Sequence, residues 1–206
     1  MLLIAANVVA YVWQKTTNGG VEYDHGWLSP QLVLEHGQWW RIVTSAFLHG
    51  NDWHIILNMI GLLWLGTVCE DVFGKARFAA LYAISILGAG LSVVYFSEYT
   101  IPGLGASGAI YGLIGALVAV ALRLGAQGRA MLKSIVPVVI LNLGLTFAFP
   151  FISAAAHVGG LITGFLAGLV LVKGRRAFAE QYAATFVPPP PPAPAAPAET
   201  IEHSRE

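Results

Sequence analysis

The longest uncharged stretch of the chain is SIVPVVILNLGLTFAFPFISAAAHVGGLITGFLAGLVLV, residues 134–172. Its 39 residues include no Asp, Glu, Lys or Arg. A transmembrane helix needs about 20 apolar residues, so the stretch is long enough for two. Residues 146–153 are aromatic and centred on Pro150. We expect the turn there, because proline removes a helix hydrogen-bond donor and restrains the residue before it.

Four more apolar segments precede this pair of predicted helices. They cover residues 1–13, 46–69, 78–97 and 101–122. Thirteen helical residues reach only about 20 Å, short of a hydrocarbon core of about 30 Å. For the first segment we therefore expect either an extension through residues 14–17 or a few missing upstream residues. The sequence predicts an all-α membrane protein with a six-transmembrane-helix core over residues 1–173.

The composition supports a membrane protein and excludes some partners. The chain is 56% hydrophobic and 11% charged, whereas soluble domains carry about 25% charged residues. Its formal net charge is zero, so no basic field favours a nucleic-acid partner. Residues 174–206 contain a run of prolines and too few apolar residues to form a core. We predict a disordered or extended proline-rich tail there.

The basic residues predict the orientation of the chain. Two of them, Lys15 and Arg41, belong to the first predicted loop. Eight others follow the second, fourth and sixth spans, on the opposite side: Lys75, Arg77, Arg123, Arg129, Lys133, Lys173, Arg175 and Arg176. Basic loops stay in the cytoplasm. We therefore expect an integral multi-pass protein of a bacterial inner membrane, with both termini cytoplasmic and the first loop outside.

Polar residues cluster at one end of three alternate predicted spans. These residues are His49, His54 and Asn58 in the second span, Ser107 in the fourth and His157 in the sixth. Alternate spans run in the same direction, so all five should lie at a similar depth below the outer surface. Polar groups inside a membrane are costly unless they are satisfied. Their coincidence predicts a functional site.

The types of these residues favour serine chemistry. Ser107 follows glycines and should occupy the first turn of a helix, where unpaired backbone N–H groups can hold an oxyanion. Glycines recur in the fourth and sixth spans, at positions 112, 115, 160, 164 and 168. Small residues let helices approach closely, which would allow a hydrogen bond between Ser107 and His157. Tyr111, one turn below Ser107, can lay its ring against the imidazole.

The remaining polar residues complete this hypothesis. No acidic residue lies deep in a span, which favours a Ser–His dyad over a triad. His54 and Asn58 are four residues apart, so both can donate hydrogen bonds toward a developing oxyanion. Asp52, beside Asn51, is expected to cap the start of the second span.

Other interpretations of the same residues remain open. Glycine and serine also serve helix packing, His157 and Tyr111 could be ordinary core residues, and His54 with Asn58 could bridge helices. A zinc site is disfavoured, because His-Glu-x-x-His is missing and His49 and His54 are five residues apart. A transporter would be expected to carry broken helices near the midplane. A non-proteolytic protein that binds membrane helices is the main alternative.

Over residues 2–172 the sequence resembles the rhomboid intramembrane serine proteases. The matching motifs are Trp40-Arg41, His49 with His54-x-x-x-Asn58, Gly66-x-x-x-Glu70-x-x-x-Gly74, Gly105-x-Ser107-Gly108 and His157-x-x-Gly160-x-x-x-Gly164. The resemblance implies a six-helix bundle with a water-filled polar cavity open to the outer face. It also implies substrates that are single-pass transmembrane proteins, cleaved within the lipid bilayer where their helices unwind locally near the outer membrane face.

The resemblance also implies a role for each matching residue. It makes Ser107 the nucleophile and His157 its base, with no metal and no cofactor. It gives supporting roles in the site to the Ser107 backbone N–H, His54, Asn58, Tyr111, His49 and Gly105. His49 would shape or hydrate the cavity, and Arg41 and Glu70 would be structural.

Overall fold

The structure is a computed structural model that describes residues 2–17, 26–97, 103–149 and 152–172. The regular elements of these residues are helices, and a single isolated bridge pairs Leu28 with Gly103. The all-α fold predicted from the sequence is therefore confirmed. The predicted proline-rich tail, residues 174–206, lies outside the described residues.

The first helix is longer than its most apolar segment. Helix α1 spans Leu2–Thr16, which agrees with the expected extension beyond residue 13. The segment that follows was expected to be one long loop, but it contains short helices. These are α3 (Pro30–Leu34), α4 (Arg41–Thr44) and the 3₁₀ turn η1 (Ser45–Phe47).

The predicted start of the second span at residue 46 is wrong. Helix α5 spans Asp52–Phe73, and its first turn is capped by Asn51, whose side chain accepts a hydrogen bond from the His54 N–H at 2.9 Å. Asp52 does not provide this cap. Its carboxylate instead accepts a hydrogen bond from Tyr11 and pairs with Lys15, 3.2 Å away. The cap at Asn51, rather than the end of the apolar run, decides where this helix begins.

Four more helices complete the bundle. They are α6 (Lys75–Phe96), α7 (Ser107–Arg123), α8 (Ala126–Ala148) and α9 (Ala154–Leu171). Helix α7 begins at Ser107, not at residue 101 as expected, because Gly105 has a positive φ of 111° that a right-handed helix does not allow. The expected turn before α9 is present between residues 148 and 154, and residues 150–151 of it lie outside the described residues.

Among the residues that the structure describes, four helices are long and apolar enough to cross a membrane. They are α5, α6, residues 128–148 of α8, and α9. Helices α1 and α7 are shorter, at 15 and 17 residues. Length and composition therefore support an integral membrane protein, while the count of six spans stays a prediction.

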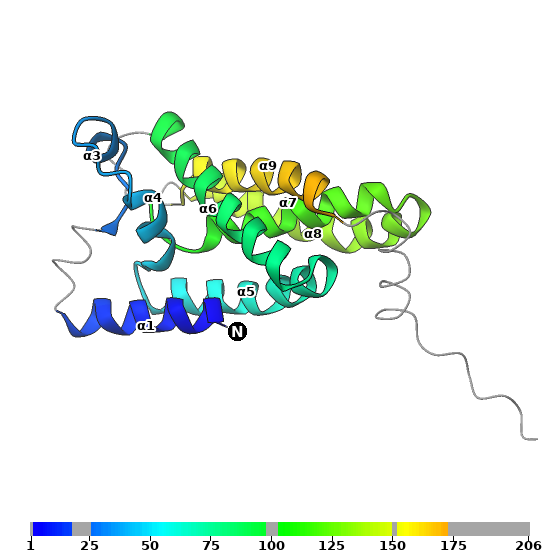
Figure 1. Ribbon diagram of the computed structural model, residues 1–206, viewed down its shortest axis with the longest axis horizontal. Helices are drawn as coiled ribbons and strands as arrows, with labels where there is room; N and C mark the ends of the chain where they lie inside the picture. Colours follow the sequence, from blue (N-terminus) through cyan, green and yellow to red (C-terminus); the bar gives the residue numbers. More distant parts are fainter. Residues whose placement is uncertain (1, 18–25, 98–102, 150–151, 173–206) are drawn as a thin grey trace, which may run out of the picture.

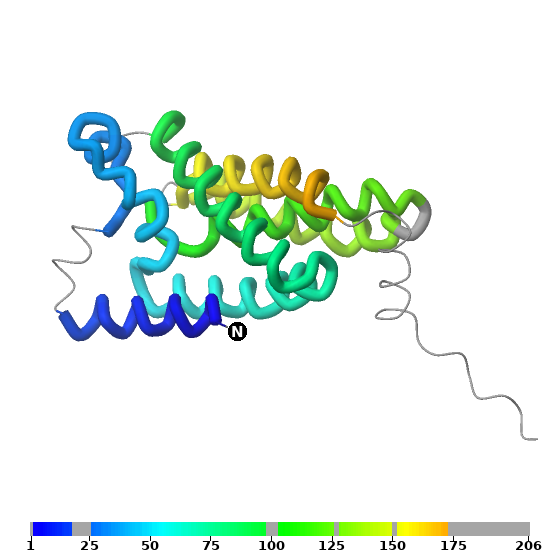
Figure 2. Tube along the Cα trace, viewed as in Figure 1, coloured from blue at the N-terminus to red at the C-terminus, as the bar shows by residue number. Residues whose placement is uncertain are grey.

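Helix α7 occupies the centre of the bundle. It packs against α9, α6, α8 and α5, and almost every residue from Gly108 to Ala121 is buried. Helix α1 lies beside α5 at one edge (Figures 1 and 2). Figure 1 also shows that α5, α7 and α9 begin at the same end of the bundle, near α3 and α4. The starts of these three helices therefore converge.

Glycines bring α7 and α9 into direct backbone contact. A Cβ atom on Gly160 would collide with the carbonyl oxygen of Gly108, and one on Gly164 would collide with that of Gly112. The seam of small residues expected from the sequence is therefore present. It brings the start of α9 within hydrogen-bonding reach of the start of α7.

Candidate active site

Ser107 and His157 meet where α7 and α9 begin. Ser107 is the first residue of α7, and His157 lies in the first turn of α9, whose start is capped by the Ser153 hydroxyl. The Ser107 Oγ atom is 2.8 Å from His157 Nε2. His157 is buried and Ser107 is partly exposed. The hydrogen bond expected between these two side chains is therefore present in the structure.

Two further side chains hold the imidazole of His157. The ring of Tyr111 stacks on it, with centroids 4.1 Å apart and an interplanar angle of 14°. The Thr146 hydroxyl, at the end of α8, lies 2.8 Å from His157 Nδ1 and 3.0 Å from the Tyr111 hydroxyl. The stack of Tyr111 follows the sequence prediction. Thr146 was missed, since no local spacing rule links residues on either side of the turn between α8 and α9.

His54 and Asn58 approach Gly105, in the loop that leads to Ser107. A Cβ atom on Gly105 would lie 2.7 Å from His54 Nε2 and 3.5 Å from Asn58 Nδ2. His54 Nδ1 accepts a hydrogen bond from the Gly50 N–H at 3.4 Å, so in the neutral ring Nε2 carries the proton. The Asn58 Nδ2 atom is buried and has no hydrogen-bond partner among the described residues. Two hydrogen-bond donors therefore lie close to Gly105, just before the start of α7.

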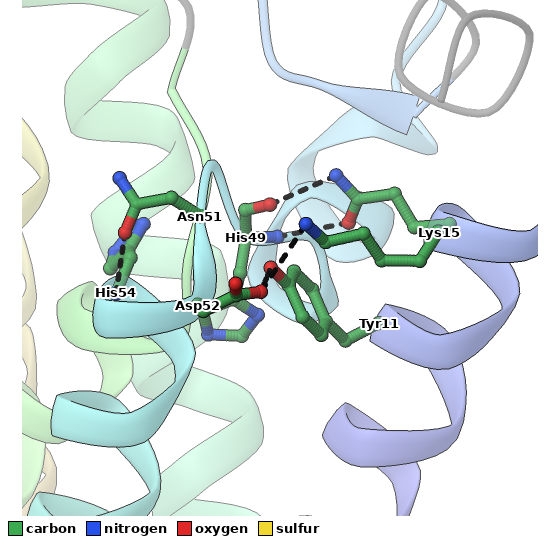
Figure 3. A network of polar contacts seen from close by, with 7 residues as sticks. Tyr11, Lys15, His49, Asn51, Asp52 and His54 are labelled. Carbon is green, nitrogen blue, oxygen red and sulfur yellow. Dashed lines mark hydrogen bonds and ion pairs between the residues drawn. The ribbon is translucent and has the colours of Figure 1, made fainter. Parts of the chain in front are cut away.

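His49 contacts His54 on the side that faces α1. Its ring is fully buried and lies edge-on to that of His54, with centroids 5.1 Å apart. The Gln14 side chain donates to the His49 carbonyl at 2.9 Å and accepts from the His49 N–H at 3.2 Å. Figure 3 shows His49 in the loop before α5, next to Tyr11 and Lys15 of α1. Gln14 was also missed, because no sequence pattern pairs α1 with this loop.

A cavity of about 690 Å³ opens beside these residues. Its polar lining includes Ser107, His157, His54 and Asn58, and its apolar lining comes mainly from α5, α6 and the loop before α7. The cavity is large enough for a short segment of extended chain and for water. The side chains of Tyr111 and His49 are not part of its lining.

Arg41 supports the segment that contains α3 and α4 rather than the cavity. Its guanidinium is buried, donates to the Trp27 carbonyl at 2.8 Å and donates through Nε to Gln38 at 2.6 Å.

Within the part of the chain that the structure describes, no three His, Cys, Asp or Glu side chains are grouped so that they could hold a metal ion.

Comparison with known proteins identifies the family. The profile of the family described as "Rhomboid domain" matches residues 36–174. This chain belongs to the rhomboid family. The match includes Ser107, His157, His54, Asn58, Tyr111, Thr146 and His49, whereas Gln14 lies outside it.

Several curated proteins are similar to this rhomboid domain. "Rhomboid protease GluP" of Bacillus subtilis (strain 168) is 37% identical over 140 residues, 68% of this chain and 27% of its own length. "RHOMBOID-like protein 5" of Arabidopsis thaliana is 36% identical over 144 residues, 68% of this chain and 46% of its own length. "Rhomboid protease AarA" of Providencia stuartii is 31% identical over 169 residues, 69% of this chain and 59% of its own length. The matches thus span from about a quarter to just under 60% of these relatives.

Proposed function

We propose that this chain is an intramembrane serine endopeptidase that cleaves transmembrane helices near the outer membrane face. The observation that carries the proposal is the 2.8 Å contact between Ser107 Oγ and His157 Nε2, at the wall of a cavity. A serine hydroxyl is a weak nucleophile until an adjacent base removes its proton. Membership of a family whose relatives include named proteases supports the same activity.

The reaction follows the acyl-transfer scheme of other serine hydrolases. His157 Nε2 takes the Ser107 proton as Oγ attacks the scissile carbonyl, and the resulting imidazolium protonates the leaving amine. Water then attacks the acyl-enzyme, with His157 again as base, and restores the Ser107 hydroxyl. The stacked ring of Tyr111 limits the movement of His157 between these steps.

The negative charge of the tetrahedral intermediate needs hydrogen-bond donors that are in place before the reaction. We assign this role to His54 Nε2, Asn58 Nδ2 and the backbone N–H of Ser107. The buried Asn58 amide, which has no partner among the described residues, supports the assignment. Leaving a buried donor unpaired costs about 1–3 kcal/mol, so its retention is understandable if the donor is used in the transition state.

The substrates we propose are single-pass membrane proteins. A peptide bond within a helix is shielded from attack, so the substrate must unwind locally before it can enter the cavity. We further propose six membrane spans, with α1 and α7 as the two short ones, and both termini in the cytoplasm. Reporter fusions after Arg176 and near Gly19 test this orientation; a cytoplasmic signal near Gly19 would reverse it.

The activity is tested with purified protein in detergent and a panel of labelled transmembrane segments. Ser107→Ala and His157→Ala should each abolish cleavage, and the double variant should be no worse, because the two residues act as one unit. Ser134→Ala is the control, since this exposed serine contacts only its own helix. If folded Ser107→Ala binds these segments but the unaltered chain never cleaves any, the chain is a non-proteolytic binding protein instead.

A further inference from the structure

The hydroxyl of Thr146 has three polar neighbours on three helices. It lies 2.8 Å from the Asn142 carbonyl oxygen of α8, 3.0 Å from the Tyr111 hydroxyl of α7 and 2.8 Å from His157 Nδ1 of α9. Only 3% of Thr146 is exposed, so water has little access to this group. The four groups must therefore satisfy one another.

Counting protons leaves a single arrangement when the imidazole is neutral. A carbonyl can only accept, so the contact with Asn142 requires the one proton of the Thr146 hydroxyl. The Tyr111 hydroxyl must then donate to Thr146. His157 Nδ1 must donate to Thr146 as well, and the two lone pairs of the threonine oxygen accept these two bonds.

This arrangement has a consequence at the other nitrogen of His157. A neutral imidazole carries one proton, and with that proton on Nδ1 the lone pair is on Nε2. Nε2 is the atom that lies 2.8 Å from Ser107 Oγ. The base is thus in the one tautomer that can accept the serine proton. The opposite tautomer would turn Nε2 into a donor toward Ser107 and leave the Thr146 proton shared between two acceptors.

We propose that Thr146 is a positioning residue that fixes the tautomer and orientation of His157. It is the third member of a Ser107–His157–Thr146 triad, in which the neutral Thr146 hydroxyl accepts the hydrogen bond from His157 Nδ1. Thr146 touches neither substrate nor the reacting atoms and acts only through the imidazole. The proposal rests on the proposed function for its effect on catalysis. The position of the proton on His157 Nδ1 does not depend on that function.

The direct test is ¹⁵N NMR of the full chain in detergent, labelled at its six histidines. The His157 signals are identified by their loss in His157→Gln. At a pH where the ring is neutral, Nδ1 should have the shift of a protonated nitrogen and Nε2 that of an unprotonated one. Thr146→Val should remove this preference, and Thr146→Ser should restore it.

Kinetics provide a second readout of the same variants. Thr146→Val should lower kcat roughly 10- to 100-fold, less than the ~10⁴-fold seen when a serine protease loses its charged orienting group. Its KM should change by less than about three-fold, because the lost interaction does not involve bound substrate. Thr67→Val is the matched control, since this exposed threonine donates only to the Leu63 carbonyl of its own helix.

The proposal is overturned if His157 of the unaltered chain carries its proton on Nε2, or if Thr146→Val keeps both the tautomer and kcat. The first measurement does not use Thr146→Val, so it stands even if that variant does not fold. Cleavage by Ser107→Ala would instead refute the proposed function, and the nitrogen shifts would still decide the tautomer.

Discussion

Gly105 and His54 lie so close that any side chain on Gly105 would displace the imidazole. A Cβ atom would be 2.7 Å from His54 Nε2 and 2.8 Å from Cε1. In proteins, Cβ atoms essentially never lie within 3.0 Å of a non-bonded heavy atom. Gly105 therefore sets how near the His54 ring can come to the start of α7, where Ser107 begins the helix.

Replacement of this glycine should impair catalysis more than its backbone strain explains. We expect Gly105→Ala to lower kcat/KM at least about ten-fold, because pushing His54 away weakens one oxyanion donor. Gly37→Ala is the control. Gly37 also has a positive φ, 67°, but a Cβ there meets nothing within 4 Å. Both variants carry a backbone strain of about 1–3 kcal/mol. Equal values of kcat/KM in the two variants would therefore show that Gly105 has no role in the site beyond its backbone conformation.

The backbone contact between α7 and α9 should be sensitive to a single methyl group. We expect Gly164→Ala to lower both the thermal stability and the cleavage rate, because its Cβ would collide with the Gly112 carbonyl and spread the helices that carry Ser107 and His157. Gly144→Ala, in α8, has no atom within 4 Å of the new Cβ. It should be neutral or stabilising by up to about 1 kcal/mol. Thermal unfolding in detergent distinguishes the two, and equal melting temperatures would contradict the packing described.

Asn58 should show opposite effects on stability and activity. We expect Asn58→Leu to lower kcat on the order of 10- to 1,000-fold, as for other lost oxyanion donors. The folded protein should be no less stable, because the substitution removes a buried amide nitrogen that has no partner among the described residues. Steady-state kinetics and thermal unfolding are measured on the same preparation. A loss of stability with unchanged kcat would make Asn58 a structural residue.

The clamp between α1 and the loop before α5 should stabilise the site from outside the shared domain. Gln14→Leu would leave the N–H and carbonyl of His49 unpaired and buried, at about 1–3 kcal/mol for each group. We expect a clear drop in melting temperature. Gln31→Leu serves as the control, because the Gln31 side chain is exposed and bonds only to Glu35, at the C-terminal cap of the same short helix. If both variants melt alike, α1 does not hold this loop.

The sequence was sufficient for the parts of the fold that hydropathy and small residues dictate. The apolar segments locate most of the helices, and the glycines of α7 and α9 predict the contact that joins Ser107 to His157. The start of α5 was misplaced because residues 46–48 are as apolar as a span, while a single side chain, Asn51, decides where the helix begins.

Two residues of the site could not be predicted for a different reason. Thr146 and Gln14 act through contacts with residues on other elements, His157 and His49, and such contacts depend on how the elements pack. Both are ordinary polar residues in helices, where a hydroxyl or amide often bonds to its own backbone. Thr146 does this as well. Only the packed arrangement reveals its second and third partners.

The central claim is that Ser107 is a nucleophile activated by His157, and covalent labelling tests it most directly. The full chain in detergent is incubated with a serine-reactive mechanism-based inhibitor, and the modified peptide is identified by mass spectrometry. We predict labelling of Ser107 in the unaltered chain, none in folded His157→Ala, and no change when a metal chelator is present. Equal labelling of Ser107 without His157, or labelling at another serine with cleavage retained in Ser107→Ala, would contradict the account.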